Sequence, residues 1–185
     1  FVALLCYKDG ERRYVLAPAG IAVGDTMMTG PDVPVSKGNR LPLGKIPVGT
    51  FVFNIALQPG TDAKLVRSAG VYAEVQAADQ GFVNIKLPSS EVRRIPETAY
   101  ASIGALSNEE HHLEVIGKAG RSRWKGRRPH VRGTAMNPVD HPHGGGEGVQ
   151  GIGLRLGPKT PWGKQAYGVR TRTPKKYSNV HIVSR

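Results

Sequence analysis

The sequence predicts a mainly β protein made of a partial barrel, a connector, a second small β-barrel and a long irregular basic C-terminal extension. Short apolar runs alternate with turn residues over the first 116 positions, and positive charge collects in the remainder. Short strands at even spacing, separated by turn residues, are typical of small barrels. We therefore divide the chain into residues 1–30, 31–49, 50–116 and 117–185.

The first part is predicted to contain two or three strands of a barrel that is cut short. Phe1–Tyr7 and Arg13–Ala17 are apolar and flank the turn Lys8-Asp9-Gly10, and Thr26–Thr29 is a third candidate. Asp and Gly tolerate positive φ, which makes this turn a hairpin signal. Cys6 is the sole cysteine, so an internal disulfide is excluded and a buried thiol in a reducing interior is expected.

The next two parts are predicted to be an extended connector and a closed or nearly closed barrel. Prolines and glycines at short intervals prevent regular elements in residues 31–49. In residues 50–116, closure of the barrel would leave no exposed strand edge. The alternating residues from Val71 to Ala77 are expected to share a buried face, and a helical turn capped by Asn108 is expected at Asn108–Val115. The five strand candidates are Phe51–Leu57, Val71–Ala77, Phe82–Leu87, Val92–Ile95 and Ser102–Leu106.

Charge divides the chain into two dissimilar segments. Residues 1–116 hold 11 Lys and Arg against 12 Asp and Glu, whereas residues 117–185 hold 15 against 2, so the net charges are −1 and +13. This asymmetry indicates an anionic partner for the second segment, with nucleic acid as the leading candidate. A membrane surface also attracts cations, but this Gly- and Pro-rich segment lacks the apolar face of a membrane-binding helix. No membrane partner is therefore expected.

The most basic segment is 118–132, where seven Lys and Arg occur within fifteen residues together with one tryptophan. Guanidinium groups pair with phosphate oxygens and stack on bases, and Trp124 offers a further stacking face. The alternative is a solvated charged loop, which would repel itself unless neutralised. Regular structure is not expected after Gly117, because this part buries too little apolar area to order itself without its partner.

A second motif reads MNPVDHPHGGGEG over residues 136–148. His141 and His143 are able to stack on or hydrogen-bond with RNA bases, and three successive glycines allow backbone N–H groups to approach phosphates. Two alternatives remain open: a metal site, and a general base at His143. Neither has a CxxC, HExxH or nucleophile companion in the sequence. The possible metal ligands are Asp140, His141, His143, Glu147 and His130.

Residues 132–148, RGTAMNPVDHPHGGGEG, resemble the signature of the universal large-subunit ribosomal protein numbered two, in its bacterial and organellar form. Further agreement comes from YKDGERRY at 7–14, IPVGT at 46–50, RSAG at 67–70 and TPWG at 160–163. The resemblance covers nearly the whole chain. It implies a partial OB-fold barrel in residues 1–30, an SH3-like barrel in residues 50–116, and an rRNA-binding extension in residues 117–185 that reaches toward the peptidyl transferase centre.

The resemblance also implies a structural constituent of the large ribosomal subunit, and not an enzyme. Such a protein binds rRNA and supports subunit association and the peptidyl transferase region during translation. Its partners would be large-subunit rRNA and other ribosomal proteins, with no cofactor of its own beyond Mg²⁺ held through the RNA. The candidate RNA-binding residues are Arg67, Ser68, Lys118, Arg121, Arg123, Trp124, Lys125, Arg127, Arg128, Arg132, Asn137, His141, His143, Gly144, Gly145, Gly146 and Trp162.

One departure from the family pattern concerns the N-terminal side. Members normally carry a basic extension and the first OB strands before the position of Phe1, so we expect either a separate polypeptide with that half or a longer chain. The near-neutral second barrel and the divergent stretches Val149–Leu156 and Arg170–Arg185 favour a mitochondrial ribosome, with a chloroplast or the bacterial cytoplasm as alternatives. A free translation or chromatin factor with an SH3-like module is the remaining rival.

Overall fold

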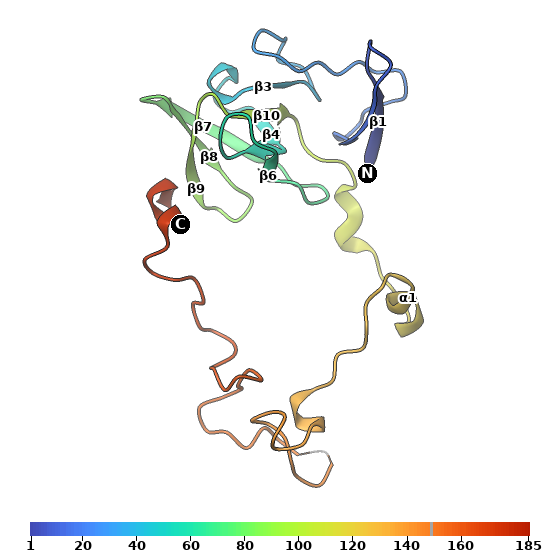
Figure 1. Cartoon of the computed structure of the whole chain (residues 1–185), viewed down its shortest axis with the longest axis vertical. Coiled ribbons are helices and arrows are strands. Elements are labelled where there is room, and N and C mark those ends of the chain that lie inside the picture. Colours follow the sequence, from blue (N-terminus) through green and yellow to red (C-terminus); the bar gives the residue numbers. More distant parts are fainter. Residues whose placement is uncertain (149) are drawn as a thin grey trace. The chain divides into compact units, whose positions relative to one another are not determined.

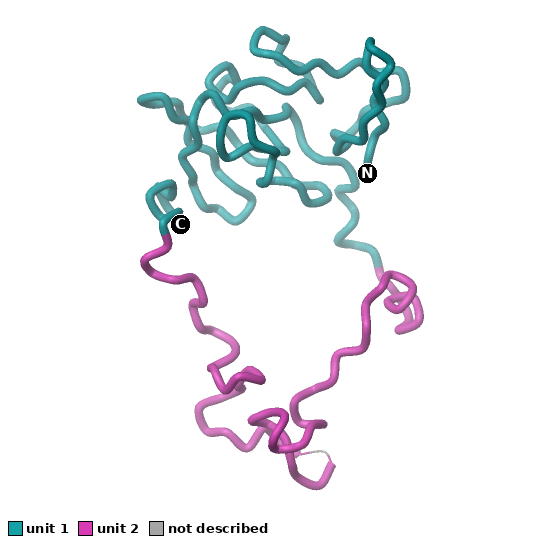
Figure 2. The backbone as a smooth tube through the Cα atoms, in the orientation of Figure 1, with its two compact units in different colours: residues 1–114, 177–185 teal, residues 115–176 magenta. Residues whose placement is uncertain are grey.

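The computed structural model describes residues 1–148 and 150–185 of the chain. One divergent stretch of the sequence thus begins at Val149, which lies outside the described residues. The described residues form two units, coloured separately in Figure 2. Unit 1 contains residues 1–114 and 177–185, and unit 2 contains residues 115–176.

The predicted N-terminal hairpin is confirmed. Strands β1 (Val2–Cys6) and β2 (Arg12–Leu16) pair antiparallel from Val2↔Leu16 to Cys6↔Arg12. Gly10 at the turn has φ +88°, a conformation that favours glycine. Cys6 is exposed, contrary to expectation, because it falls on the same open face of β1 as Val2 and Leu4. The third candidate strand does not form, and only Thr29 makes an isolated bridge, to Arg40.

A seven-stranded antiparallel sheet forms the body of unit 1 and confirms the mainly β class. Figure 1 shows how its central strands lie beside one another. Asn54, with φ +50°, splits the expected strand 51–57 in two and sends its second half into a separate two-stranded sheet. In spatial order the large sheet contains β11 (Ile182–Ser184), β9 (Val92–Pro96), β8 (Phe82–Lys86), β7 (Ala73–Asp79), β4 (Phe51–Phe53), β10 (Tyr100–Ile103) and β3 (Arg40–Pro42). The small sheet contains β5 (Ile55–Ala56) and β6 (Ala63–Leu65).

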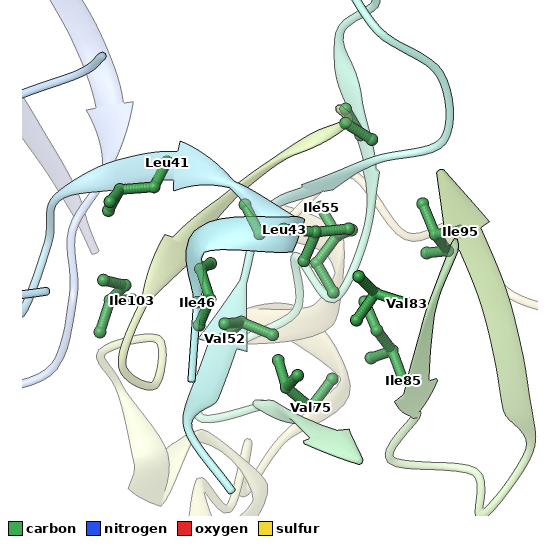
Figure 3. Close-up of a cluster of buried hydrophobic side chains, with 14 residues drawn as sticks. Leu41, Leu43, Ile46, Val52, Ile55, Val75, Val83, Ile85, Ile95 and Ile103 are labelled. Atoms are coloured by element: carbon green, nitrogen blue, oxygen red, sulfur yellow. The ribbon is translucent and has the colours of Figure 1, made fainter. Parts of the chain in front are cut away.

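The core of unit 1 consists of aliphatic side chains, most of them from these strands, drawn in Figure 3. Val52, Ile55, Val83 and Ile85 are completely buried. Alternation along β8 places Val83 and Ile85 inward, as the period of a strand requires. The expectation for Ala77 was wrong, because the pairing shifts register between Val75 and Ala77 and turns Ala77 outward.

The connector 31–49 contains regular structure that the sequence analysis excluded. Strand β3 and the 3₁₀ helix η1 (Leu43–Lys45) both lie within it. Leu41 and Leu43 are 2% and 0% exposed and join the core, and the Leu43 N–H donates to the Ala99 carbonyl at 2.8 Å. Pro42 ends the strand, so its missing N–H breaks no ladder in the middle of the sheet.

The expectation of no regular structure after Gly117 was also wrong. This part contains α1 (Ala119–Trp124), the 3₁₀ helices η3 (Gly133–Ala135) and η4 (Tyr177–His181), and strand β11. The expected turn after Asn108 forms as η2 (Glu109–Leu113), although the Asn108 side chain makes no capping hydrogen bond. None of the helices in the described ranges is long and apolar enough to cross a membrane.

Ile85→Val is expected to lower the free energy of unfolding by about 0.5–1.5 kcal/mol, because it removes one buried methylene from a fully enclosed position. Urea denaturation followed by far-UV circular dichroism measures this change. Val23→Ala is the control, because Val23 is fully exposed. Equal stabilities for the two variants would contradict the assigned core.

Candidate nucleic-acid interface

Helix α1 gives the basic segment 118–132 a local structure. The N–H groups of Lys125 and Gly126 donate to carbonyls at Arg121 and Arg123, which closes the short helix. The Lys118 ammonium lies 4.9 Å from the centroid of the Trp124 ring, within the range of a cation–π contact. Trp124 is 74% exposed, so much of its ring remains open for stacking.

Unit 2 carries the whole net charge of the protein. It holds 14 Lys and Arg against two acidic residues, Asp140 and Glu147, for a net charge of +12. Arg121, Arg123, Arg127 and Arg128 are all exposed. Among the described residues, no carboxylate lies within ion-pairing distance of these four arginines. Their charge is therefore available to an external anion.

The segment from Met136 to Gly146 folds into a compact loop, called here the glycine loop. The Gly144 N–H donates to the His141 carbonyl at 2.8 Å, and the Gly145 N–H donates to the Met136 carbonyl at 3.1 Å. A Cβ at Gly144 would lie 2.2 Å from the Asn137 carbonyl oxygen, so only glycine fits there. Two of the three amides expected to face phosphates are thus used inside the loop.

His141 and His143 meet at the centre of the glycine loop. Their ring centroids are 4.6 Å apart in an edge-on arrangement, and His141 is only 7% exposed. The His143 N–H donates to His141 Nδ1 at 2.9 Å, while the Lys159 N–H donates to His143 Nε2 at 2.8 Å. A Cβ at Gly133 would lie 2.4 Å from His141 Nδ1, so glycine at that position makes room for the ring.

A second turn, the hairpin 158–166, presents Trp162. Lys159 and Gln165 form an isolated antiparallel bridge, and the Thr160 N–H donates to the Lys164 carbonyl at 2.7 Å. The Gln165 side-chain amide bonds to the Leu156 carbonyl. Trp162 at the turn is 83% exposed. Through Lys159, this hairpin is joined directly to His143 of the glycine loop.

Arg67 and Ser68 lie in unit 1, at the exposed surface of the loop that follows β6. The Arg67 guanidinium donates to the Ala63 carbonyl at 3.2 Å. The preceding Val66 has φ +54°, and its carbonyl accepts the Asn54 N–H at 2.9 Å. The loop is thus held by the backbone, with both predicted side chains left outward.

Arg67 lines a groove of about 1050 Å³ together with residues that the sequence analysis did not select. Arg40 donates to the Asn54 carbonyl at 2.8 Å, and burial lowers the pKa of its guanidinium, although arginine stays charged. Arg13 pairs with Glu11 at 2.8 Å, and this hydrogen bond raises the pKa of Arg13. The tyrosines and arginines of the motif YKDGERRY could have indicated these groove residues as candidates for RNA binding. The groove residues missed are Tyr7, Lys8, Arg13, Tyr14 and Arg40.

The structure brings together only some of the predicted site residues. Asn137, His141, His143, Gly144 and Gly145 share the glycine loop, with Trp162 in the hairpin bonded to it. Gly146 ends the same loop, with φ +98°. Arg132 precedes η3, whereas the cationic residues Lys118–Arg128 surround α1.

The proposed metal ligands do not converge. Within residues 1–148 and 150–185, no group of three or more His, Cys, Asp or Glu side chains is placed to hold a metal ion. One ring nitrogen of each histidine, Nδ1 of His141 and Nε2 of His143, instead accepts a backbone hydrogen bond. The geometry therefore gives no support to the metal alternative.

A strongly basic, glycine-rich unit with exposed cations is typical of proteins that assemble with nucleic acid. Residues 36–163 match the family model described as Ribosomal Proteins L2, C-terminal domain, and the chain belongs to this family. It is accordingly a structural, non-enzymatic constituent of the ribosome that takes part in translation. The match includes both the glycine loop and Trp162.

Proposed function

We propose that this protein is a component of the large ribosomal subunit that binds rRNA mainly through unit 2, and so supports subunit association and the peptidyl transferase region. The observation that carries the proposal is the concentration of the whole +12 charge in unit 2, where Arg121, Arg123, Arg127 and Arg128 are exposed and have no carboxylate partner among the described residues. An RNA backbone is the polyanion that such a surface neutralises.

Affinity and shape recognition have different sources in this proposal. The arginines of segment 118–132 contact phosphates, with release of counterions, and this supplies most of the binding free energy. Trp124 and Trp162 stack on unpaired bases, because both rings are largely exposed. The glycine loop holds a fixed backbone shape against the RNA. Mg²⁺ enters this scheme only as an ion held by the RNA.

The direct test is binding of the purified chain to a large-subunit rRNA transcript over a range of salt concentrations. Affinity that falls steeply with salt is expected for contacts to several phosphates. A transfer RNA of similar charge density is the control for shape recognition. Salt-independent binding, or equal affinity for both RNAs at every salt concentration, would contradict the proposal.

Arg67→Ala is expected to weaken binding to the rRNA transcript several-fold, since one exposed guanidinium in the groove of unit 1 is lost. Its thermal unfolding should stay almost unchanged, because the one hydrogen bond of the Arg67 side chain within the described residues is to the Ala63 carbonyl. Lys64→Ala is the matched control, an exposed cation nearby in β6. If the two variants bind alike, the groove does not contact RNA.

A polypeptide partner is proposed for β1. Within residues 1–148 and 150–185 this strand pairs on one side only, with β2, so its other edge presents unpaired backbone groups. A pocket of about 900 Å³ lies beside it, lined by apolar residues and by the acidic Asp25, Glu109 and Glu110, and Phe1, Val2 and Leu4 are exposed there. We assign the hairpin to an OB-fold barrel completed by a strand from a separate polypeptide, and the large sheet to an SH3-like barrel.

The proposed compartment is the mitochondrion, in preference to a chloroplast or the bacterial cytoplasm. The support is the near-neutral second barrel and the divergent stretches Val149–Leu156 and Arg170–Arg185 of the extension. Cell fractionation followed by immunodetection of the ribosomal fraction decides among these compartments.

A further inference from the structure

Each histidine of the glycine loop uses one ring nitrogen as a hydrogen-bond acceptor. His141 Nδ1 accepts the His143 N–H, and His143 Nε2 accepts the Lys159 N–H. A ring nitrogen that accepts a hydrogen bond carries no proton, so the network assigns the Nε2–H tautomer to His141 and the Nδ1–H tautomer to His143. Both rings are neutral in this arrangement.

We propose that His141 and His143 position the hairpin 158–166 by acting as neutral acceptors, and that the positioned Trp162 stacks on one unpaired RNA base. The stacking half rests on the proposed rRNA binding, whereas the positioning half does not. His143 joins two segments that are 16 residues apart in sequence. His141, seated against Gly133, holds the backbone of His143 in place.

The hairpin suits an unpaired base because it combines an open ring with nearby cations. Trp162 is 83% exposed at the turn, and Lys159 and Lys164 flank it in sequence, on the two sides of the turn. Aromatic stacking is tolerant of base identity, and lysines contact the adjoining phosphates. The base bound by Trp162 would therefore be any pyrimidine or purine that is not paired with another strand.

This role differs from that of a cationic or basic histidine. A histidine that binds phosphate as a cation donates from both ring nitrogens, and a general base needs a free acceptor nitrogen. His143 Nε2 meets neither condition, because the Lys159 amide occupies it. Glutamine is therefore the better mimic of His143, since its side-chain oxygen reaches about as far as Nε2, and lysine the worse one.

The first experiment measures amide hydrogen exchange at Lys159 by NMR in the full chain without RNA. We expect His143→Gln to keep the protection of wild type, while His143→Leu and His143→Lys exchange about tenfold faster, the effect of losing one hydrogen bond. His130→Leu is the control, because His130 is exposed. Amides of β7 and β8 report whether unit 1 stays folded. Full protection in His143→Leu or His143→Lys would overturn the acceptor role.

The second experiment follows Trp162 fluorescence while a short single-stranded oligouridine is added. The chain has two tryptophans, so a Trp124→Phe background, excited at the red edge where tyrosine does not absorb, leaves Trp162 as the sole tryptophan emitter. We expect quenching on binding, with affinity about tenfold lower for His143→Leu and unchanged for His143→Gln. Binding without quenching would overturn the stacking role alone. Absence of RNA binding would overturn the proposed function and the stacking together, while the exchange result still decides the positioning.

Discussion

Simultaneous replacement of Arg121, Arg123, Arg127 and Arg128 by alanine is expected to abolish stable assembly into the large subunit. The four guanidinium groups are exposed, and each has the geometry to pair with a phosphate. Affinity for the rRNA transcript should fall by at least about 100-fold at physiological salt, because hydrogen bonds to charged groups contribute roughly 1.5–3 kcal/mol each. The slope of log affinity against log salt should become shallower by about 3.

The matched control removes the same amount of charge from unit 1. Lys37, Lys45, Lys64 and Lys86 are exposed lysines, and their joint replacement by alanine should change RNA affinity far less. Filter binding over a salt series compares the two quadruple variants. Normal incorporation of the arginine variant into the subunit, or equal losses in both variants, would refute the assignment of the RNA contacts to segment 118–132.

Gly144→Ala is expected to break the glycine loop. The added Cβ would lie 2.2 Å from the Asn137 carbonyl oxygen, so the backbone must move and the bond from the Gly144 N–H to the His141 carbonyl is lost. A cost of roughly 3 kcal/mol in local stability follows from such overpacking against backbone. The protection of the Gly145 and Lys159 amides should disappear together, because both depend on the same loop.

The control for this substitution is Gly151→Ala. Nothing lies within 4 Å of a Cβ at Gly151, so the same chemical change there should leave exchange rates unchanged. Hydrogen exchange followed by NMR compares the variants residue by residue. Retained protection at Gly145 in Gly144→Ala would show that the loop is not held as described.

Sequence patterns predicted the strands well where the local pattern of apolar and turn residues is enough to define the strand. The hairpin β1–β2 and strand β8 follow directly from apolar runs and turn residues. Strand β3 was not predicted, because the prolines around it argue against a strand. It forms because it pairs with β10, which is distant in sequence. The outward turn of Ala77 required a register shift that no alternation pattern contains.

The candidate site, too, could be predicted from the sequence only in part. The basic composition of segment 118–132 predicted open cations, and the structure leaves the four arginines exposed. The internal bonds of Gly144 and Gly145 were not foreseen, because they depend on the fold of the loop around Asn137. The sequence separation of His143 and Lys159 does not reveal the hydrogen bond from the Lys159 N–H to His143 either. The two segments are brought together by the turns between them.

Membership of the large subunit is tested by sucrose-gradient sedimentation of a lysate that contains the tagged chain, at low and high salt, with mass spectrometry of the comigrating fractions. We expect comigration with the large subunit that survives high salt, together with a polypeptide that supplies the strand beside β1. Migration as a free 19.9 kDa species at both salt concentrations would refute the assignment to the large subunit.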